Sequence, residues 1–162
     1  MKTLESLESF KKGDLSKALE EVAIELDKQL ESKEGQDQVV AISKGIQQEQ
    51  REKGNTEFSG GDASEEILRK IPEKVGCTAC VVLVTATEIY VANVGDSRAV
   101  LSQGLSVYDL SDDHKPENEE EEQRIVKARG NVDNGRVNGE LALSRAIGDM
   151  HYKRNPNLSV AE

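Results

Sequence analysis

The spacing of apolar residues predicts helices in the first part of the chain. Between Leu15 and Leu30 the apolar side chains recur three or four positions apart, at Leu15, Ala18, Leu19, Val22, Ala23, Leu26 and Leu30. This spacing places them on one face of a helix, and Asp14 directly before them is a favourable N-cap. A shorter helix is expected at Leu4–Phe10. A single apolar stripe on a charged helix indicates that the helix packs against another part of the fold.

The next segment, Glu31–Gly61, is polar and has few apolar positions. It is compatible either with a weak helix or with an insertion. Within it, Asn55–Gly61 has the composition of a flexible linker. We therefore expect a helical part over residues 1–53, followed by a polar insertion or linker to about residue 75.

From Gly76 the pattern changes to that of short strands. Runs rich in Val, Tyr and Ile alternate with small or turn residues; the runs are Cys77–Thr85, Glu88–Val94, Ser97–Gln103 and Leu105–Leu110. Short strands joined by tight turns predict an antiparallel meander over residues 76–110.

A loop and a helix are expected over residues 111–130. The acidic run Glu117–Glu122 suits the first turn of this helix, because carboxylates are favourable near a helix N-terminus, and we expect it to be solvated. Residues 131–162 read as a hairpin around Asn134-Gly135 followed by a long, flap-like loop. Helices before and after a run of antiparallel strands predict an α+β layered fold.

Composition narrows the class of protein. The formal net charge is -10, from 31 acidic and 21 basic residues. Such a surface repels phosphate backbones, so we expect no nucleic-acid partner. The longest apolar run, Ala79–Val84, is far shorter than the ~20 residues of a membrane helix, and the first residues contain no apolar-centred secretory signal. We expect a soluble intracellular protein, cytoplasmic or nuclear, with no membrane partner.

The two cysteines, Cys77 and Cys80, are three positions apart. On a strand, residues three apart point to opposite faces, so these thiols cannot share one metal ion. No second Cys/His pair exists to complete a zinc site. We expect both to be ordinary reduced thiols.

Asp96 is the candidate metal ligand that the residues themselves offer. It lies in a tight Gly-Asp turn between two apolar strands. A carboxylate fixed at a strand end suits hard cations such as magnesium or manganese. The alternative is that Asp96 serves only as a favoured turn residue.

Three sequence signatures and one helix carry a family resemblance. Val91–Val100 contains Gly95-Asp96-Ser97-Arg98, Asp113–Pro116 reads Asp-His-Lys-Pro, and Arg136–Asp149 forms a third signature. With the helix from Phe10 to Leu30, these features resemble the metal-dependent protein serine/threonine phosphatases of the protein phosphatase 2C (PPM or PP2C) type. They stand in that family's order and cover nearly the whole chain.

The resemblance implies a sandwich of antiparallel β-sheets flanked by helices, incomplete in this chain. It implies hydrolysis of phosphoserine and phosphothreonine in phosphorylated protein substrates by a metal-activated water, with Mg²⁺ or Mn²⁺ as cofactor. Asp96 matches the family's ligand to an additional third metal ion. Arg145 falls near the substrate entrance, where it contacts either substrate phosphate or an acidic neighbour in a structural salt bridge. His114 and Asp149 match motif positions for which we expect structural roles.

The main metal-ligand motifs of that family, Asp-Gly-His-Gly-Gly and Asp-Gly-x-Trp-Asp, are absent from this sequence, which contains no Trp. The sequence therefore predicts a fragment of a phosphatase that is inactive alone. Two alternatives stay open: a catalytically dead phosphatase-like protein-interaction module, and an unrelated acidic interaction domain.

Overall fold

A computed structural model describes residues 2–54 and 65–153 of the chain. Its N-terminal part is helical, with α1 at Lys2–Ser6, α2 at Glu8–Lys11, α3 at Leu15–Glu31 and α4 at Lys33–Glu52. Asp14 caps α3 as predicted, since the Lys17 backbone N–H donates to Asp14 Oδ1 at 3.2 Å. The single short helix expected at residues 4–10 is instead two helices that meet at Leu7. Of the two alternatives for residues 33–52, a weak helix or an insertion, the structure shows a helix.

Helix α5, at Glu65–Lys74, corrects the prediction of a linker up to about residue 75. Pro72 within this segment disfavours a helix on sequence grounds, because proline cannot donate the backbone hydrogen bond of a helix interior. The structure accommodates Pro72 in the last turn of α5, where it is buried. The linker predicted at residues 55–61 lies outside the described residues.

The strands from residue 79 to 109 form two separate hairpins. Strand β2 at Ala79–Val84 pairs with β3 at Ile89–Val94, and β4 at Val100–Gln103 pairs with β5 at Ser106–Asp109. The prediction of a continuous meander is wrong at one position, because β3 and β4 are not hydrogen-bonded neighbours.

The backbone between β3 and β4 bonds to a segment further along the chain. His114 N–H donates to the Gly95 carbonyl at 2.9 Å, and Leu110 N–H donates to the Ala99 carbonyl at 2.9 Å. The Ala99 N–H in turn donates to Ser111 Oγ at 2.9 Å. The first bond joins the end of β3 to residue 114, and the other two continue the contacts of the β4–β5 hairpin, so residues 95–99 separate the two hairpins.

The remaining elements are short. Strand β1 at Gly76–Cys77 pairs with β8 at Ile147–Gly148, helix α6 spans Glu119–Lys127, and the 3₁₀ helix η2 spans Met150–Tyr152. Strands β6 at Val132–Asp133 and β7 at Arg136–Val137 form the predicted hairpin. Its turn residues Asn134 and Gly135 both have positive φ, 51° and 71°, which fits a type I′ turn. The predicted α+β class with antiparallel strands is confirmed.

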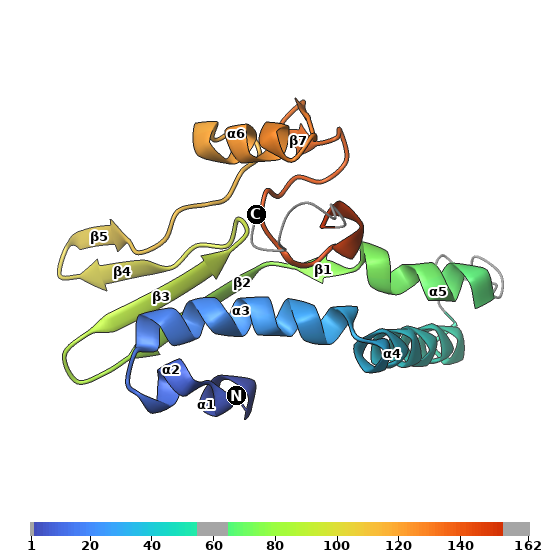
Figure 1. Ribbon diagram of the computed structural model, residues 1–162, viewed down its shortest axis with the longest axis horizontal. Helices are drawn as coiled ribbons and strands as arrows, with labels where there is room; N and C mark the ends of the chain where they lie inside the picture. Colours follow the sequence, from blue (N-terminus) through green and yellow to red (C-terminus); the bar gives the residue numbers. More distant parts are fainter. Residues whose placement is uncertain (1, 55–64, 154–162) are drawn as a thin grey trace.

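Helix α3 contacts both β3 and β8, and Figure 1 shows it along one side of the β2–β3 hairpin with α6 on the other side. Asp27 of α3 is buried and joins the helix to the end of the described chain. Its Oδ1 accepts from the Gly148 N–H at 2.8 Å, and its Oδ2 pairs with Lys153. Lys153 also donates to the Ala146 carbonyl at 2.7 Å, so one buried carboxylate organises the segment from 146 to 153.

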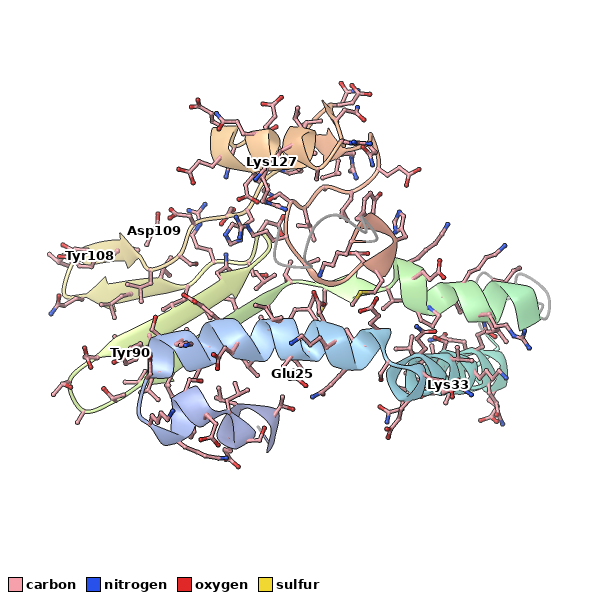
Figure 2. All side chains as sticks on the ribbon, viewed as in Figure 1. Glu25, Lys33, Tyr90, Tyr108, Asp109 and Lys127 are labelled. Carbon is pink, nitrogen blue, oxygen red and sulfur yellow. The ribbon has the colours of Figure 1, made fainter. Side chains whose placement is uncertain are left out.

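Large apolar surfaces stay open on both hairpins. Val82 and Val84, on one face of β2, are 48% and 67% exposed, and Val81 on the other face is 44% exposed. Tyr108, labelled in Figure 2 at the outer hairpin, is 49% exposed. Among the described residues the buried apolar side chains are few: Ala18, Leu19, Leu68, Ile125, Val137, Ala146, Ile147 and Met150. Within the described part of the chain, no helix combines the length and apolar character of a membrane span.

Because two-stranded sheets are marginal alone and exposed apolar edges promote pairing with other chains, we expect the purified chain to associate. The measurement is size-exclusion chromatography with light scattering over a range of concentrations. Replacing Val82 and Val84 together by threonine retains strand propensity and is expected to shift the chain toward the monomer. The control is Ile42→Ala on α4, which is 62% exposed and is expected to have a smaller effect. Sharp two-state unfolding of a monomeric wild-type chain would contradict this prediction.

Candidate functional site

The turn after β3 fixes the position of Asp96. Gly95 has a φ of 106°, which favours glycine, and a Cβ there would lie 2.5 Å from Thr78 Cγ2 and 3.2 Å from the Arg145 carbonyl oxygen. Ser97 Oγ lies 2.8 Å from Thr78 Oγ1, so the residues on both sides of Asp96 contact Thr78. The site is thus built on a turn that tolerates no side chain at residue 95.

His114 holds three segments together. It donates its backbone N–H to the Gly95 carbonyl at 2.9 Å, and its ring Nδ1 accepts from the Gly95 N–H at 3.2 Å. Its carbonyl oxygen accepts from the Ser144 N–H at 3.2 Å. These contacts place His114 in a loop-fixing role, between the Asp96 turn and the loop that contains Arg145.

The carboxylate of Asp96 pairs with Lys115, the residue after His114. The Asp96 side chain is 29% exposed and that of Lys115 is 40% exposed. A second ion pair lies next to it, with Arg98 Nε donating to Asp113 Oδ1 at 2.9 Å. This hydrogen bond from Arg98 lowers the pKa of Asp113.

Arg145 contacts an acidic neighbour on helix α6. Its Nε and Nη2 donate to Glu121 Oε1 at 3.0 and 2.6 Å, and its Nε also donates to Glu121 Oε2 at 3.0 Å. Arg124 Nη2 donates to the same carboxylate at 3.0 Å and bonds the Ser144 carbonyl at 2.5 Å. The guanidinium of Arg145 therefore faces α6, while its carbonyl oxygen packs over Gly95.

Glu121 corrects the expectation that the acidic run is solvated. Its side chain is only 7% exposed, whereas Glu119, Glu120 and Glu122 are exposed. The sequence does contain a signal for the burial of Glu121. Glu121 and Ile125 are four positions apart, so they lie on the same face of α6, and both face inward. Two further site residues, Lys115 and Thr78, show no such local pattern, since both act through tertiary contacts.

Asp149 lies at a junction in the backbone. It is buried, with a φ of 50°, and its N–H donates to the Val75 carbonyl at 2.9 Å. Burial raises the pKa of its carboxyl group. Its position at the β8 end, away from the Asp96 turn, agrees with the structural role expected for it.

The donor set tests whether a metal pair fits the described residues. Among them, no cluster of three or more His, Cys, Asp or Glu side chains is arranged to hold a metal ion. Asp96 supplies one carboxylate, and Lys115 already neutralises it. The described residues of this chain therefore do not fit a two-metal site by themselves.

A cleft of about 1230 Å³ lies between α3, β3 and the segment from residue 124 to 153. Its apolar lining includes Leu19, Ile24, Val91, Ile125, Leu141 and Ile147. His114 and Arg145 border it, but Asp96 does not. The cleft is therefore lined by two residues that contact the Asp96 turn but not by Asp96 itself.

Comparison with known proteins identifies the family. The protein phosphatase 2C family matches residues 5–162. This chain belongs to that family. The resemblance drawn from the three signatures is confirmed. In this phosphatase 2C chain, those signatures form the turn at Asp96, the contacts of His114 with Gly95 and Ser144, and the loop that contains Arg145.

The matches to relatives cover between about half of this chain and nearly all of it. "Probable protein phosphatase 2C 2" of Paramecium tetraurelia is 40% identical over 154 residues, which are 95% of this chain and 44% of the relative. "Probable protein phosphatase 2C 11" of rice is 58% identical over 80 residues, 49% of this chain and 22% of the relative. A crystal structure of a phosphatase from Toxoplasma gondii is 31% identical and covers 52% of this chain and 38% of its own, with a TM-score of 0.40. The chain spans less than half the length of the relatives it matches.

Proposed function

We propose that this chain is a portion of a metal-dependent protein serine/threonine phosphatase. The whole enzyme hydrolyses phosphoserine and phosphothreonine in proteins with a metal-activated water, and its cofactor is Mg²⁺ or Mn²⁺. The observation that carries the proposal is the family match over residues 5–162.

The geometry of the site supports the proposal. Asp96 is the carboxylate that this chain contributes. Gly95, with its positive φ, and the hydrogen bonds between Gly95 and His114 fix it at the end of β3. A carboxylate held this rigidly loses little freedom when a hard cation binds. The further ligands have to come from sequence that this chain lacks.

A chimera tests the proposal. "Protein phosphatase 2C 1" of Paramecium tetraurelia is 39% identical over 150 residues, which are 42% of its length. Its matched segment is replaced by this chain, and phosphate release from a phosphothreonine peptide is measured with manganese. We expect manganese-dependent hydrolysis by the chimera.

Two variants sharpen the test. Asp96→Asn in the chimera is expected to reduce turnover by at least about tenfold, since even an outer-shell residue of a metal site costs that much. The matched control, Asp112→Asn, changes an exposed carboxylate nearby and is expected to leave turnover unchanged. A folded but inactive chimera beside an active host would favour the catalytically dead interaction module.

A further inference from the structure

The outer edge of β3 faces the cleft. Every residue of β3, from Ile89 to Val94, lines the cleft, whereas β2, which is also fully described, contributes none. Successive side chains of a strand point to opposite faces of a sheet, so a cleft against one face would be lined mainly by every second residue. Contact with consecutive residues therefore places the cleft along the edge of β3 that lies away from β2.

The hydrogen bonds of the hairpin show which backbone groups lie on this edge. Thr85 N–H donates to the Glu88 carbonyl at 2.9 Å, so these two residues are a hydrogen-bonded pair next to the turn. Bonded and non-bonded pairs alternate along an antiparallel ladder. In the register of β2 with β3, the N–H and C=O groups of Ile89, Val91 and Asn93 therefore point away from β2. The sheet has two strands, so no strand of the described chain pairs with these groups.

Apolar side chains line the cleft on both sides of this edge. Helix α3 contributes Leu19 and Ile24, and α6 with the segment that follows it contributes Ile125, Leu141 and Ile147 (Figure 1). An extended segment that pairs with β3 would direct alternate side chains toward these two sides. A strand that is buried on both faces is apolar along its whole length. The cleft thus fits a short, continuously apolar strand of about six residues, about 20 Å long.

The source of this strand follows from how much of the family is present. The match to "Probable protein phosphatase 2C 2" covers 95% of this chain but 44% of that relative, so more than half of the relative has no counterpart here. A two-stranded sheet is marginally stable alone, and a third strand would satisfy its outer backbone groups. A second copy of this chain is a poorer occupant. Each copy has a net charge of -10, and its longest apolar run, Ala79–Val84, is already paired with β3.

We propose that the outer edge of β3 is a docking site for one further β-strand, supplied by the part of a phosphatase 2C chain that lies outside the matched segment. The strand joins the sheet through main-chain hydrogen bonds to Ile89, Val91 and Asn93, and its apolar side chains fill the cleft. The inference rests on the proposed function in taking this chain as a portion of a larger phosphatase, but its test requires no hydrolysis.

Amide hydrogen exchange tests the docking site in the 162-residue chain and in the chimera. In the chain alone, the amides of Ile89, Val91 and Asn93 are expected to exchange at least about tenfold faster than those of Tyr90 and Ala92, which face β2. In the chimera we expect the two sets to exchange at similar rates, because the added strand binds the outer N–H groups. Since both sets lie on one strand, their ratio does not depend on the overall stability of either protein.

The outcomes of this experiment separate the inference from the proposed function. A folded chimera in which the three outer amides still exchange at least about tenfold faster would overturn the inference, even if the chimera hydrolyses phosphothreonine. Protection of these amides in a concentrated solution of the chain alone would also overturn it, because a second copy would then occupy the edge. Protected amides in an inactive chimera would support the docking site and count against the proposed function alone.

A second measurement does not depend on the folding of the chimera. The isotopically labelled 162-residue chain is titrated with overlapping peptides of "Protein phosphatase 2C 1" of Paramecium tetraurelia, taken from outside its matched segment. We expect at least one peptide to shift the amide NMR signals of Ile89, Val91 and Asn93. If no peptide shifts these signals, the inference is wrong.

A pair of variants locates the bound peptide in the cleft. Leu141→Asp places a charge among the apolar side chains of the cleft and is expected to weaken binding of that peptide at least about tenfold, because burying an unpaired carboxylate is costly. The matched control, Ile42→Asp, adds the same charge to α4 outside the cleft and is expected to leave binding unchanged. Equal weakening by both variants would mean that the peptide binds elsewhere and would refute the docking site.

Discussion

The 162-residue chain alone is expected to release no phosphate from a phosphothreonine peptide, with or without manganese. Activation of water by two metal ions needs several carboxylates to hold both ions. The sequence contains neither Asp-Gly-His-Gly-Gly nor Asp-Gly-x-Trp-Asp, and the carboxylate of Asp96 is paired with Lys115. The expected effect is therefore complete loss of turnover compared with the chimera. The measurement is phosphate release over a manganese series.

The control for this experiment is Asp96→Asn in the same 162-residue chain. Trace activity that is equal in wild type and variant comes from a contaminating phosphatase. Robust manganese-dependent turnover that Asp96→Asn abolishes would show that the residues of this chain suffice for catalysis. The view that the absent motifs are essential would then be wrong.

Local sequence patterns predicted the elements whose stabilising contacts are local. The spacing from Leu15 to Leu30 gave the position of α3, and Asp14 its start. The Asn134-Gly135 pair predicted a hairpin because both turn residues adopt positive φ. The tight Gly-Asp turn predicted at residues 95–96 is instead a bend, and residues 95–99 separate β3 from β4.

The parts that sequence reasoning missed depend on distant residues. His114, which lies nineteen positions after Gly95, binds the Gly95 backbone where β3 and β4 separate. Similarly, the Lys115 ion pair joins Asp96 to a different loop. No pattern confined to one segment identifies such partners. Helix α5, by contrast, was missed although a local signal exists in the helical spacing of Ile67, Leu68 and Ile71.

Replacing Arg145 by alanine is expected to destabilise the chain by about 1–3 kcal/mol at pH 7, less than for a fully buried ion pair because the Arg145 side chain is 43% exposed. Glu121, only 7% exposed, would keep its charge, and Arg124 Nη2 would still donate to it at 3.0 Å. Urea unfolding followed by circular dichroism measures the change. The matched control is Lys127→Ala, an exposed residue at the end of α6 (Figure 2), expected to change stability by less than about 0.5 kcal/mol.

This experiment also separates the two roles proposed for Arg145. A guanidinium that serves only to contact substrate phosphate can be removed without loss of stability, so an unchanged unfolding curve would favour that role. If Arg145 is instead the counter-charge of Glu121, adding Glu121→Gln to Arg145→Ala is expected to recover part of the loss. The neutral amide needs no counter-charge, so its burial costs less than that of an unpaired carboxylate.

The pH dependence of this loss tests its electrostatic cause. Burial by itself raises the pKa of Glu121, but hydrogen bonds, chiefly from Arg145, outweigh it and lower the pKa from 4.5 to about 2. A lowered pKa in the folded state stabilises the chain above about pH 4.5, and this stabilisation disappears as the pH falls toward 2. Without Arg145 the pKa of Glu121 rises, so the difference in unfolding free energy between wild type and Arg145→Ala is expected to be full at pH 7 and to shrink below pH 4.5. A difference that stays constant down to pH 3 would show that Arg145 stabilises the loop by packing rather than through the charge of Glu121.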